Sequence, residues 1–130
     1  MKAILLLTVF ISGCTSIAQS LTAGQEKEYQ AKVQNVEKTC QIDLNYEAHA
    51  HRVLESKLLP IIDIGVSEQC LVSVLSFKNY KINKTKSKYG VSKQYVITTG
   101  YKYINQNAGS IPSDFMYVYT ENGEVTSIQN

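Results

Sequence analysis

The chain has little net charge for its length. Its 130 residues include 13 basic and 11 acidic side chains, which leave a formal charge of +2. An excess this small does not support nucleic-acid binding as the main function. Charged residues make up 18% of the sequence and apolar residues 44%, a composition that suits one small globular domain. Internal repeats and low-complexity tracts are missing as well, so repeat architectures are not expected.

Long hydrophobic runs and catalytic motifs are also scarce. After the apolar N-terminal stretch, no run approaches the ~18–20 residues that a membrane-spanning helix needs. The sequence contains no nucleophile elbow, no phosphate-binding glycine loop and no zinc-protease motif. We therefore expect a protein that is not an enzyme, with no cofactor, no metal and no second membrane segment.

The N-terminus is typical of an export signal. Lys2 supplies a positive start, and residues 3–11 are apolar apart from Thr8. The segment ISGC, which ends at Cys14, resembles the lipobox of bacterial lipoproteins. The resemblance implies removal of residues 1–13 and attachment of a lipid to Cys14, which anchors the protein on the membrane. Thr15 then implies delivery to the outer membrane, with the domain in the periplasm. The alternative is an ordinary leader that is cut a few residues later.

Two cysteines remain once Cys14 is assigned to a lipid. An even pair in an exported domain predicts a disulfide between Cys40 and Cys70. In the chain-entropy model such a loop is worth about 3–4 kcal/mol. Two buried free thiols are the alternative. Zinc is not expected, because the metal takes four ligands and no histidine lies at finger spacing from this pair.

The first half of the chain has helical periodicity. After a polar tether over residues 14–24, apolar side chains share one face of a predicted helix at residues 25–38. A second helix is predicted at residues 45–58, ahead of Pro60, with Tyr46, Ala50, Val53, Leu54 and Leu58 on one face. Ser67 is a good N-cap for a third, short helix.

The period changes from helical to alternating after residue 77. Residues 92–99 and 101–104 are predicted to form a strand with a bulge or bend at Gly100, followed by a polar loop at residues 105–114. Residues 115–120 and 124–129 flank an Asn-Gly pair, a strong hairpin signal. We therefore expect an α+β fold, in which two to three N-terminal helices pack on a three-stranded antiparallel β-meander. This two-layer sandwich forms a single domain at residues 25–130.

Four motifs occur in order over residues 61–129: Gly65 with Ser67, the pair Tyr89-Gly90, the run Gln94-Tyr95-Val96 and the pair Asn122-Gly123. Together they resemble the SmpA/OmlA (BamE-like) family of small bacterial outer-membrane lipoproteins. The resemblance implies the α+β fold and a lipoprotein setting. The sequence differs from the family pattern in three ways. SFKNY occupies the position of a Gly-x-Pro turn, and Tyr95 lies where tryptophan is common. The first forty-odd residues after the leader, with two predicted helices and Cys40, exceed what the smallest members carry.

His49 and His51 form an H-x-H pair. Side chains two residues apart converge on a strand, but on a helix they diverge by about 200°. Because residues 45–58 are predicted to be helical, we interpret both as surface histidines, with Glu47 and Glu55 as partners for His51. A metal site on a strand is the alternative.

The strongest functional signal is a lysine-rich segment. Residues 77–102 contain seven lysines and no acidic residue, and we expect an exposed loop here. Such a loop suits contact with anionic lipid headgroups or an acidic protein face. The alternative is a solvated loop whose lysines protect a sheet edge. The predicted partner-binding residues are Lys81, Lys84, Lys86, Lys88, Tyr89, Tyr95 and Tyr117.

These observations predict a lipid-anchored cell-envelope protein that binds another envelope component, either a protein or anionic lipid, with a role related to outer-membrane assembly or integrity. A periplasmic inhibitor or immunity-type protein that binds a hydrolase is the second hypothesis. The arrangement of a small α+β domain fits both, since fold alone does not determine function.

Overall fold

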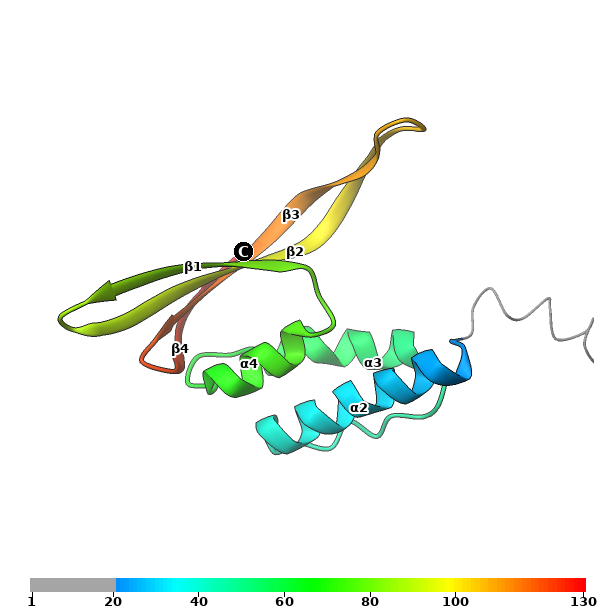
Figure 1. The fold of residues 1–130 in the computed structure, drawn as a ribbon, viewed down its shortest axis with the longest axis horizontal. Coiled ribbons are helices and arrows are strands. Elements are labelled where there is room, and N and C mark those ends of the chain that lie inside the picture. The colour runs from blue at the N-terminus through cyan, green and yellow to red at the C-terminus, as the bar shows by residue number, and fades with distance from the viewer. Residues whose placement is uncertain (1–20) are drawn as a thin grey trace, which may run out of the picture.

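The computed structural model describes residues 21–130, so the predicted signal peptide, Cys14 and most of the predicted tether lie outside the described residues. Helices come first in the chain and strands follow (Figure 1). The elements are α2 (Ala23–Cys40), α3 (His51–Leu58), the 3₁₀ turn η1 (Leu59–Ile61), α4 (Glu68–Leu75), β1 (Tyr80–Ser87), β2 (Gly90–Asn105), β3 (Gly109–Glu121) and β4 (Glu124–Gln129).

Helix α2 begins two residues earlier than the periodicity predicts. Thr22 and Gln25 form a capping box: the Gln25 amide donates to Thr22 Oγ1 (3.1 Å), and the Thr22 amide donates to Gln25 Oε1 (3.0 Å). The predicted tether therefore ends before Ala23. Val33 and Val36 are buried as the predicted helical face requires.

Helix α3 is shorter than predicted. Asn45 and His49 have positive φ angles of 51° and 66°, which an α-helix does not accommodate. The segment before α3 is instead a turn, held by Glu26, which accepts hydrogen bonds from the Tyr46 hydroxyl and the His49 amide. The predicted face is wrong at Val53, which is 59% exposed.

Helix α4 begins where the sequence predicts. The Cys70 amide donates to Ser67 Oγ (3.2 Å), which is the expected N-cap bond. The segment before α4 is also tied to β4, because the Gly65 amide donates to the Val125 carbonyl and the Val125 amide donates to the Val66 carbonyl. These bonds fix the helix against the sheet.

The sheet has four antiparallel strands in the order β1-β2-β3-β4, one more than predicted. The additional strand is β1, whose lysine-rich sequence was expected to form a loop. Lys and Asn have low β-propensity, so pairing with β2 over eight residues, rather than local preference, makes this segment a strand. The α+β class is confirmed, with the helices gathered against one face of the sheet (Figure 1).

One core joins the two layers. Its buried side chains come from α2, α3, α4, the helix-facing side of the sheet and two connecting segments: Val33, Val36, Leu44, Leu54, Leu58, Ile62, Leu71, Val74, Leu75, Tyr95, Ile97, Met116, Val118 and Val125.

Strands β2 and β3 extend well beyond their neighbours. Strand β1 pairs with β2 only as far as Ile97, and β4 pairs with β3 only from Tyr117. The remainder is a two-stranded ribbon that projects away from the helices (Figure 1). The predicted loop at residues 105–114 is wrong, because the turn is short and Pro112 belongs to β3. The outer edge of β3 is free there, so a proline is tolerated.

Candidate functional site

The two faces of the sheet have different neighbours. Tyr95 and Ile97 on β2 point toward the helices, as does Val118 on β3, and all three are buried. Because successive side chains alternate between faces, Gln94 and Tyr119 belong to the opposite, open face. The helices described here all lie on the other side of the sheet (Figure 1).

Tyr95 is not a surface residue, and its assignment as a partner-binding residue is wrong. Only 1% of it is exposed, and its hydroxyl donates a hydrogen bond to the Glu68 carboxylate. Lys93 Nζ lies 2.9 Å from the same carboxylate. Both groups on β2 therefore reach the first turn of α4, and this small cluster joins the helix to the sheet.

The cluster shifts two pKa values. Burial pushes the pKa of Glu68 upward, but hydrogen bonds from Lys93 and Tyr95 outweigh it and leave the pKa below its ordinary value. Burial, together with the bond to Glu68, raises the pKa of the Tyr95 hydroxyl. At neutral pH Glu68 is thus a carboxylate engaged by both neighbours, which suits a structural tie.

A chain of side-chain hydrogen bonds crosses the open face from strand to strand. Asn83 Nδ2 on β1 donates to Gln94 Oε1 on β2 (2.8 Å). Gln94 Nε2 donates to the Tyr119 hydroxyl on β3 (3.0 Å), which donates to Gln129 Oε1 on β4 (3.3 Å). Tyr117 is half-buried on the same face. The face is therefore polar. Tyr117 lies in the same cross-strand row as Lys81, two strands away, because Val96 pairs with both residues.

The lysines of the predicted site lie together on β1, at one edge of the sheet. Every residue of this strand is exposed. Lys88 and Tyr89 form the two-residue turn between β1 and β2, and Lys88 Nζ lies 5.1 Å from the centroid of the Tyr89 ring. Five of the seven predicted residues thus share one region: Lys81, Lys84, Lys86, Lys88 and Tyr89.

This region carries uncompensated positive charge. Within residues 21–130, Lys93 forms an ion pair with Glu68, but none of the four lysines of β1 and its turn forms one. The sequence has no acidic residue between Glu68 and Asp114. None of these lysines is therefore held in an ion pair among the described residues, and Glu121 lies near the turn, beside Ser87 and Tyr89.

The turn between β1 and β2 is held at the same end of the sheet as the turn between β3 and β4. The Val91 amide donates to Asn122 Oδ1 (3.1 Å), and the Asn122 amide donates to the Val91 carbonyl (3.0 Å). Asn122 adopts φ of 52°, as the Asn-Gly hairpin signal predicts. These bonds fix the base of the β1–β2 hairpin.

The histidines lie apart from this region. His49 is in the turn before α3, and its amide donates to Glu26. His51 is the first residue of α3, and its Nδ1 is buried without a hydrogen-bond partner among the described residues. Within residues 21–130, no cluster of three or more His, Cys, Asp or Glu side chains is arranged to hold a metal ion.

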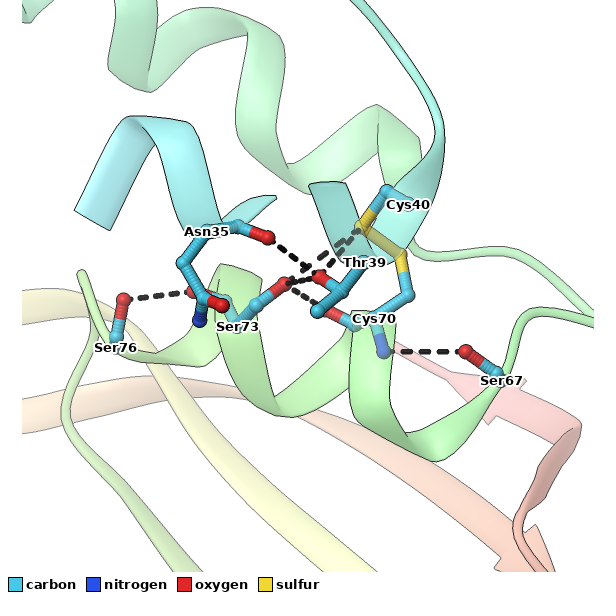
Figure 2. Close-up of a disulfide and its surroundings, with 7 residues drawn as sticks. All are labelled: Asn35, Thr39, Cys40, Ser67, Cys70, Ser73 and Ser76. Atoms are coloured by element: carbon cyan, nitrogen blue, oxygen red, sulfur yellow. Dashed lines mark hydrogen bonds between the residues drawn. A yellow bond between two sulfur atoms is a disulfide. The ribbon is translucent and has the colours of Figure 1, made fainter. Parts of the chain in front are cut away.

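Cys40 and Cys70 form a disulfide, as predicted (Figure 2). It joins the end of α2 to α4, with Cα atoms 4.8 Å apart. Thr39 Oγ1 lies 2.8 Å from Ser73 Oγ, whose hydroxyl donates to the Cys70 carbonyl (2.6 Å). The helix pair is therefore linked covalently and by hydrogen bonds at one place.

Two surface features went unpredicted. The first is the strand character of β1, which the alternation of Tyr80 and Ile82 with polar residues indicates in retrospect. The second is the β3 half of the ribbon, which pairs with the predicted strand at residues 101–104. Tyr101, Tyr103 and Ile111 are exposed on the ribbon. Pro112 concealed the ribbon in the sequence, because proline usually argues against a strand.

Comparison of the chain with protein-family models, with curated proteins and with solved structures yields no match in any of the three. The resemblance to the SmpA/OmlA family therefore stays a prediction. Among residues 21–130, no helix has both the length and the apolar character required to cross a bilayer.

Proposed function

We propose that this chain is a lipid-anchored, non-enzymatic protein of the bacterial cell envelope that binds another envelope component. The lipobox-like segment before Cys14 supports the anchor. The disulfide between Cys40 and Cys70 is in keeping with export to an oxidising compartment. The lipid places the domain on the periplasmic side of the outer membrane, with a role in outer-membrane assembly or integrity.

The observation that carries the binding proposal is the charge of strand β1. Four exposed lysines lie on one edge strand and its turn, and none is paired with a carboxylate among the described residues. Clustered charge of one sign accelerates encounter with an oppositely charged partner. The partner is therefore an anionic component of the envelope.

A second candidate function rests on the projecting ribbon. Tyr101 and Tyr103 are exposed on this narrow two-stranded extension. A protruding hairpin with exposed aromatic side chains is suited to entering a cleft of another protein. An inhibitor or immunity-type protein that binds a periplasmic hydrolase would use such an element.

Site-specific photo-crosslinking in cells tests the two candidates. A photoreactive residue at Lys86 should capture a membrane-associated component, whereas one at Tyr103 should capture a soluble hydrolase if the second candidate is correct. Val53, which is exposed on α3, is the control position and should give no specific product. An empty result at both Lys86 and Tyr103 contradicts both candidates.

A further inference from the structure

Strand β1 has a free backbone edge. The Thr98 amide donates to the Asn79 carbonyl, so the pair that follows, Tyr80 with Ile97, is a non-hydrogen-bonded pair. Bonded and non-bonded pairs alternate along an antiparallel ladder. Alternate residues of β1 therefore direct their N–H and C=O groups away from β2, and these residues are Tyr80, Ile82, Lys84 and Lys86.

This edge is regular over its whole length. The register between β1 and β2 continues without a shift through eight pairs, and β1 contains no proline. The other edge strand, β4, has six residues and a register shift opposite Tyr119 and Thr120. Bulges, prolines, short lengths and charged side chains, lysine above all, are the usual means by which sheet edges avoid pairing with other chains. Of these means β1 has only its lysines, which act against some partners and not against others.

The lysines determine which partner the edge accepts. A second copy of the chain would bring two lysine-rich strands side by side, and like charges on neighbouring strands are unfavourable. A segment that carries carboxylates would pair with the same lysines favourably. We propose that the free edge of β1 binds an extended, acidic segment of a partner protein, which joins the sheet as a fifth strand. This inference rests on the proposed function and names its partner class.

The side chains of β1 also specify a pattern in the partner. On the helix-facing side, Tyr80 and Ile82 come first and Lys84 and Lys86 follow. Tyr80 is 37% exposed and Ile82 is 47% exposed, so both have apolar surface available. Side chains directly opposite each other on neighbouring strands interact. The partner segment therefore has two apolar residues at alternate positions, followed or preceded by two carboxylates at alternate positions.

A synthetic peptide tests this pattern. The probe is the capped octapeptide Val-Thr-Val-Thr-Glu-Thr-Glu-Thr, used together with its reversed sequence because the orientation of the added strand is free. The control has the same composition in an order that breaks the alternation. Binding of the dye-labelled peptides to the full mature protein is followed by fluorescence anisotropy at low salt. We expect one of the two ordered peptides to bind at least about tenfold more tightly than the control, and equal binding overturns the proposal.

Amide hydrogen exchange locates the added strand. The outward amides of Ile82 and Lys84 should exchange at least about tenfold more slowly with the peptide bound. The amides of Asn83 and Thr85, which already face β2, are internal controls and should change little. Peptide binding without protection of Ile82 and Lys84 overturns strand addition.

Two sets of variants distinguish the contribution of backbone hydrogen bonds to peptide binding from the contribution of the lysine charges. Ile82→Pro removes one outward N–H group, while Ile82→Ala shortens the same side chain and keeps that group. We expect Ile82→Pro to weaken binding about tenfold relative to Ile82→Ala, and equal affinities overturn strand addition. The double variant Lys84→Glu and Lys86→Glu should also weaken binding at least tenfold. The control variant Lys57→Glu on α3 should not weaken peptide binding. If it weakens binding as much as the double variant does, the proposal is overturned. If Ile82→Pro does not fold, the exchange data decide.

Lipid and self-association are separate outcomes. Binding to phosphatidylglycerol vesicles but to neither ordered peptide overturns this inference and leaves the proposed function in place. Self-association that blocks the peptide also overturns it. A membrane-associated crosslink at Lys86 without peptide binding likewise contradicts only the proposed partner class. The absence of any crosslink at Lys86 contradicts the proposed function itself.

Discussion

The hydroxyl of Tyr95 on β2 donates a hydrogen bond to the carboxylate of Glu68 on α4. This relationship explains why an aromatic residue in a sheet next to a lysine-rich edge is not part of the surface. The helix layer covers Tyr95, and Glu68 satisfies its one polar atom, so the ring is buried without leaving an unpaired hydroxyl. Tyr95 is thus a structural residue that connects the two layers.

Replacing Tyr95 with phenylalanine should destabilise the fold. The ring remains, but Glu68 loses a hydrogen-bond donor in a mostly buried position, which costs about 1–2 kcal/mol. Tyr103→Phe, on the exposed ribbon, is the matched control and should change the free energy of unfolding by less than about 0.5 kcal/mol. Urea denaturation of the two variants measures both values. Equal effects would show that the hydroxyl of Tyr95 contributes nothing to stability.

The stability of the domain should fall as the pH falls. The pKa of Glu68 is lowered in the folded state, because the hydrogen bonds from Lys93 and Tyr95 outweigh the effect of burial. A carboxyl group of this kind stabilises the fold above its unfolded-state pKa. That contribution is lost as the pH drops through the folded-state pKa.

Glu68→Gln identifies the group responsible for this pH dependence. Its free energy of unfolding should change less between neutral and acid pH than that of the native chain. Some dependence should remain, because the pKa of Glu26 is also lowered, by hydrogen bonds from the His49 amide and Tyr46 that outweigh burial. Denaturation curves over the range from about pH 7 to pH 3 provide the test. A Glu68→Gln profile as steep as that of the native chain would rule out this role for Glu68.

Removal of the disulfide should weaken the fold strongly. The double variant Cys40→Ser with Cys70→Ser opens a loop with a sequence separation of 30 residues. The chain-entropy model gives a loss of about 3–4 kcal/mol, measured by chemical denaturation under oxidising conditions. Each single variant should lose a similar amount, since each removes the same bond. A double variant within about 1 kcal/mol of the native chain contradicts a stabilising disulfide.

The projecting ribbon should contribute little to stability. Replacement of residues 102–111 by Asn-Gly, together with Pro112→Thr, joins two positions that pair across the ribbon, 101 and 112. Threonine supplies the N–H group that closes the new turn and that proline lacks. The removed part packs on none of the helices described here, so we expect a loss below about 1 kcal/mol, measured by thermal or urea unfolding. A larger loss contradicts the independence of the ribbon. The same variant tests the inhibitor hypothesis, because it keeps β1 and removes Tyr103.

Cys14→Ala should release the protein from the membrane. Without the thiol, no lipid is attached, so the variant should lose incorporation of labelled palmitate and leave the membrane fraction. Ser16→Ala, two residues away, is the control and should remain anchored. Fractionation and radiolabelling measure both. A Cys14→Ala variant that is still processed and still membrane-bound contradicts the lipoprotein prediction.

Several features of this protein follow from the sequence alone because their causes are local. The buried face of α2 follows from side chains that recur with the helical period, and Ser67 caps α4 through a bond within one turn. The turn at Asn122 follows from the conformational preference of an Asn-Gly pair. The disulfide has no local cause, since its cysteines are 30 residues apart. It was predicted because two cysteines remain once Cys14 is assigned to a lipid, and such a pair in an exported domain is usually oxidised.

Other features depended on contacts between distant parts of the chain. The lysine-rich segment is a strand because β2 lies beside it, and its own residues favour a strand only weakly. The turn before α3 exists because Glu26, which lies 20 residues before Tyr46 and 23 before His49, accepts hydrogen bonds from both residues. Alternation groups Tyr117 with Tyr119 on one face of β3, but only the packing of the helices decided that Tyr95 is buried and Tyr119 lies on the open face. The sequence by itself thus determined the local elements. The tertiary structure decided which surfaces remain exposed, because burial depends on what packs against each face.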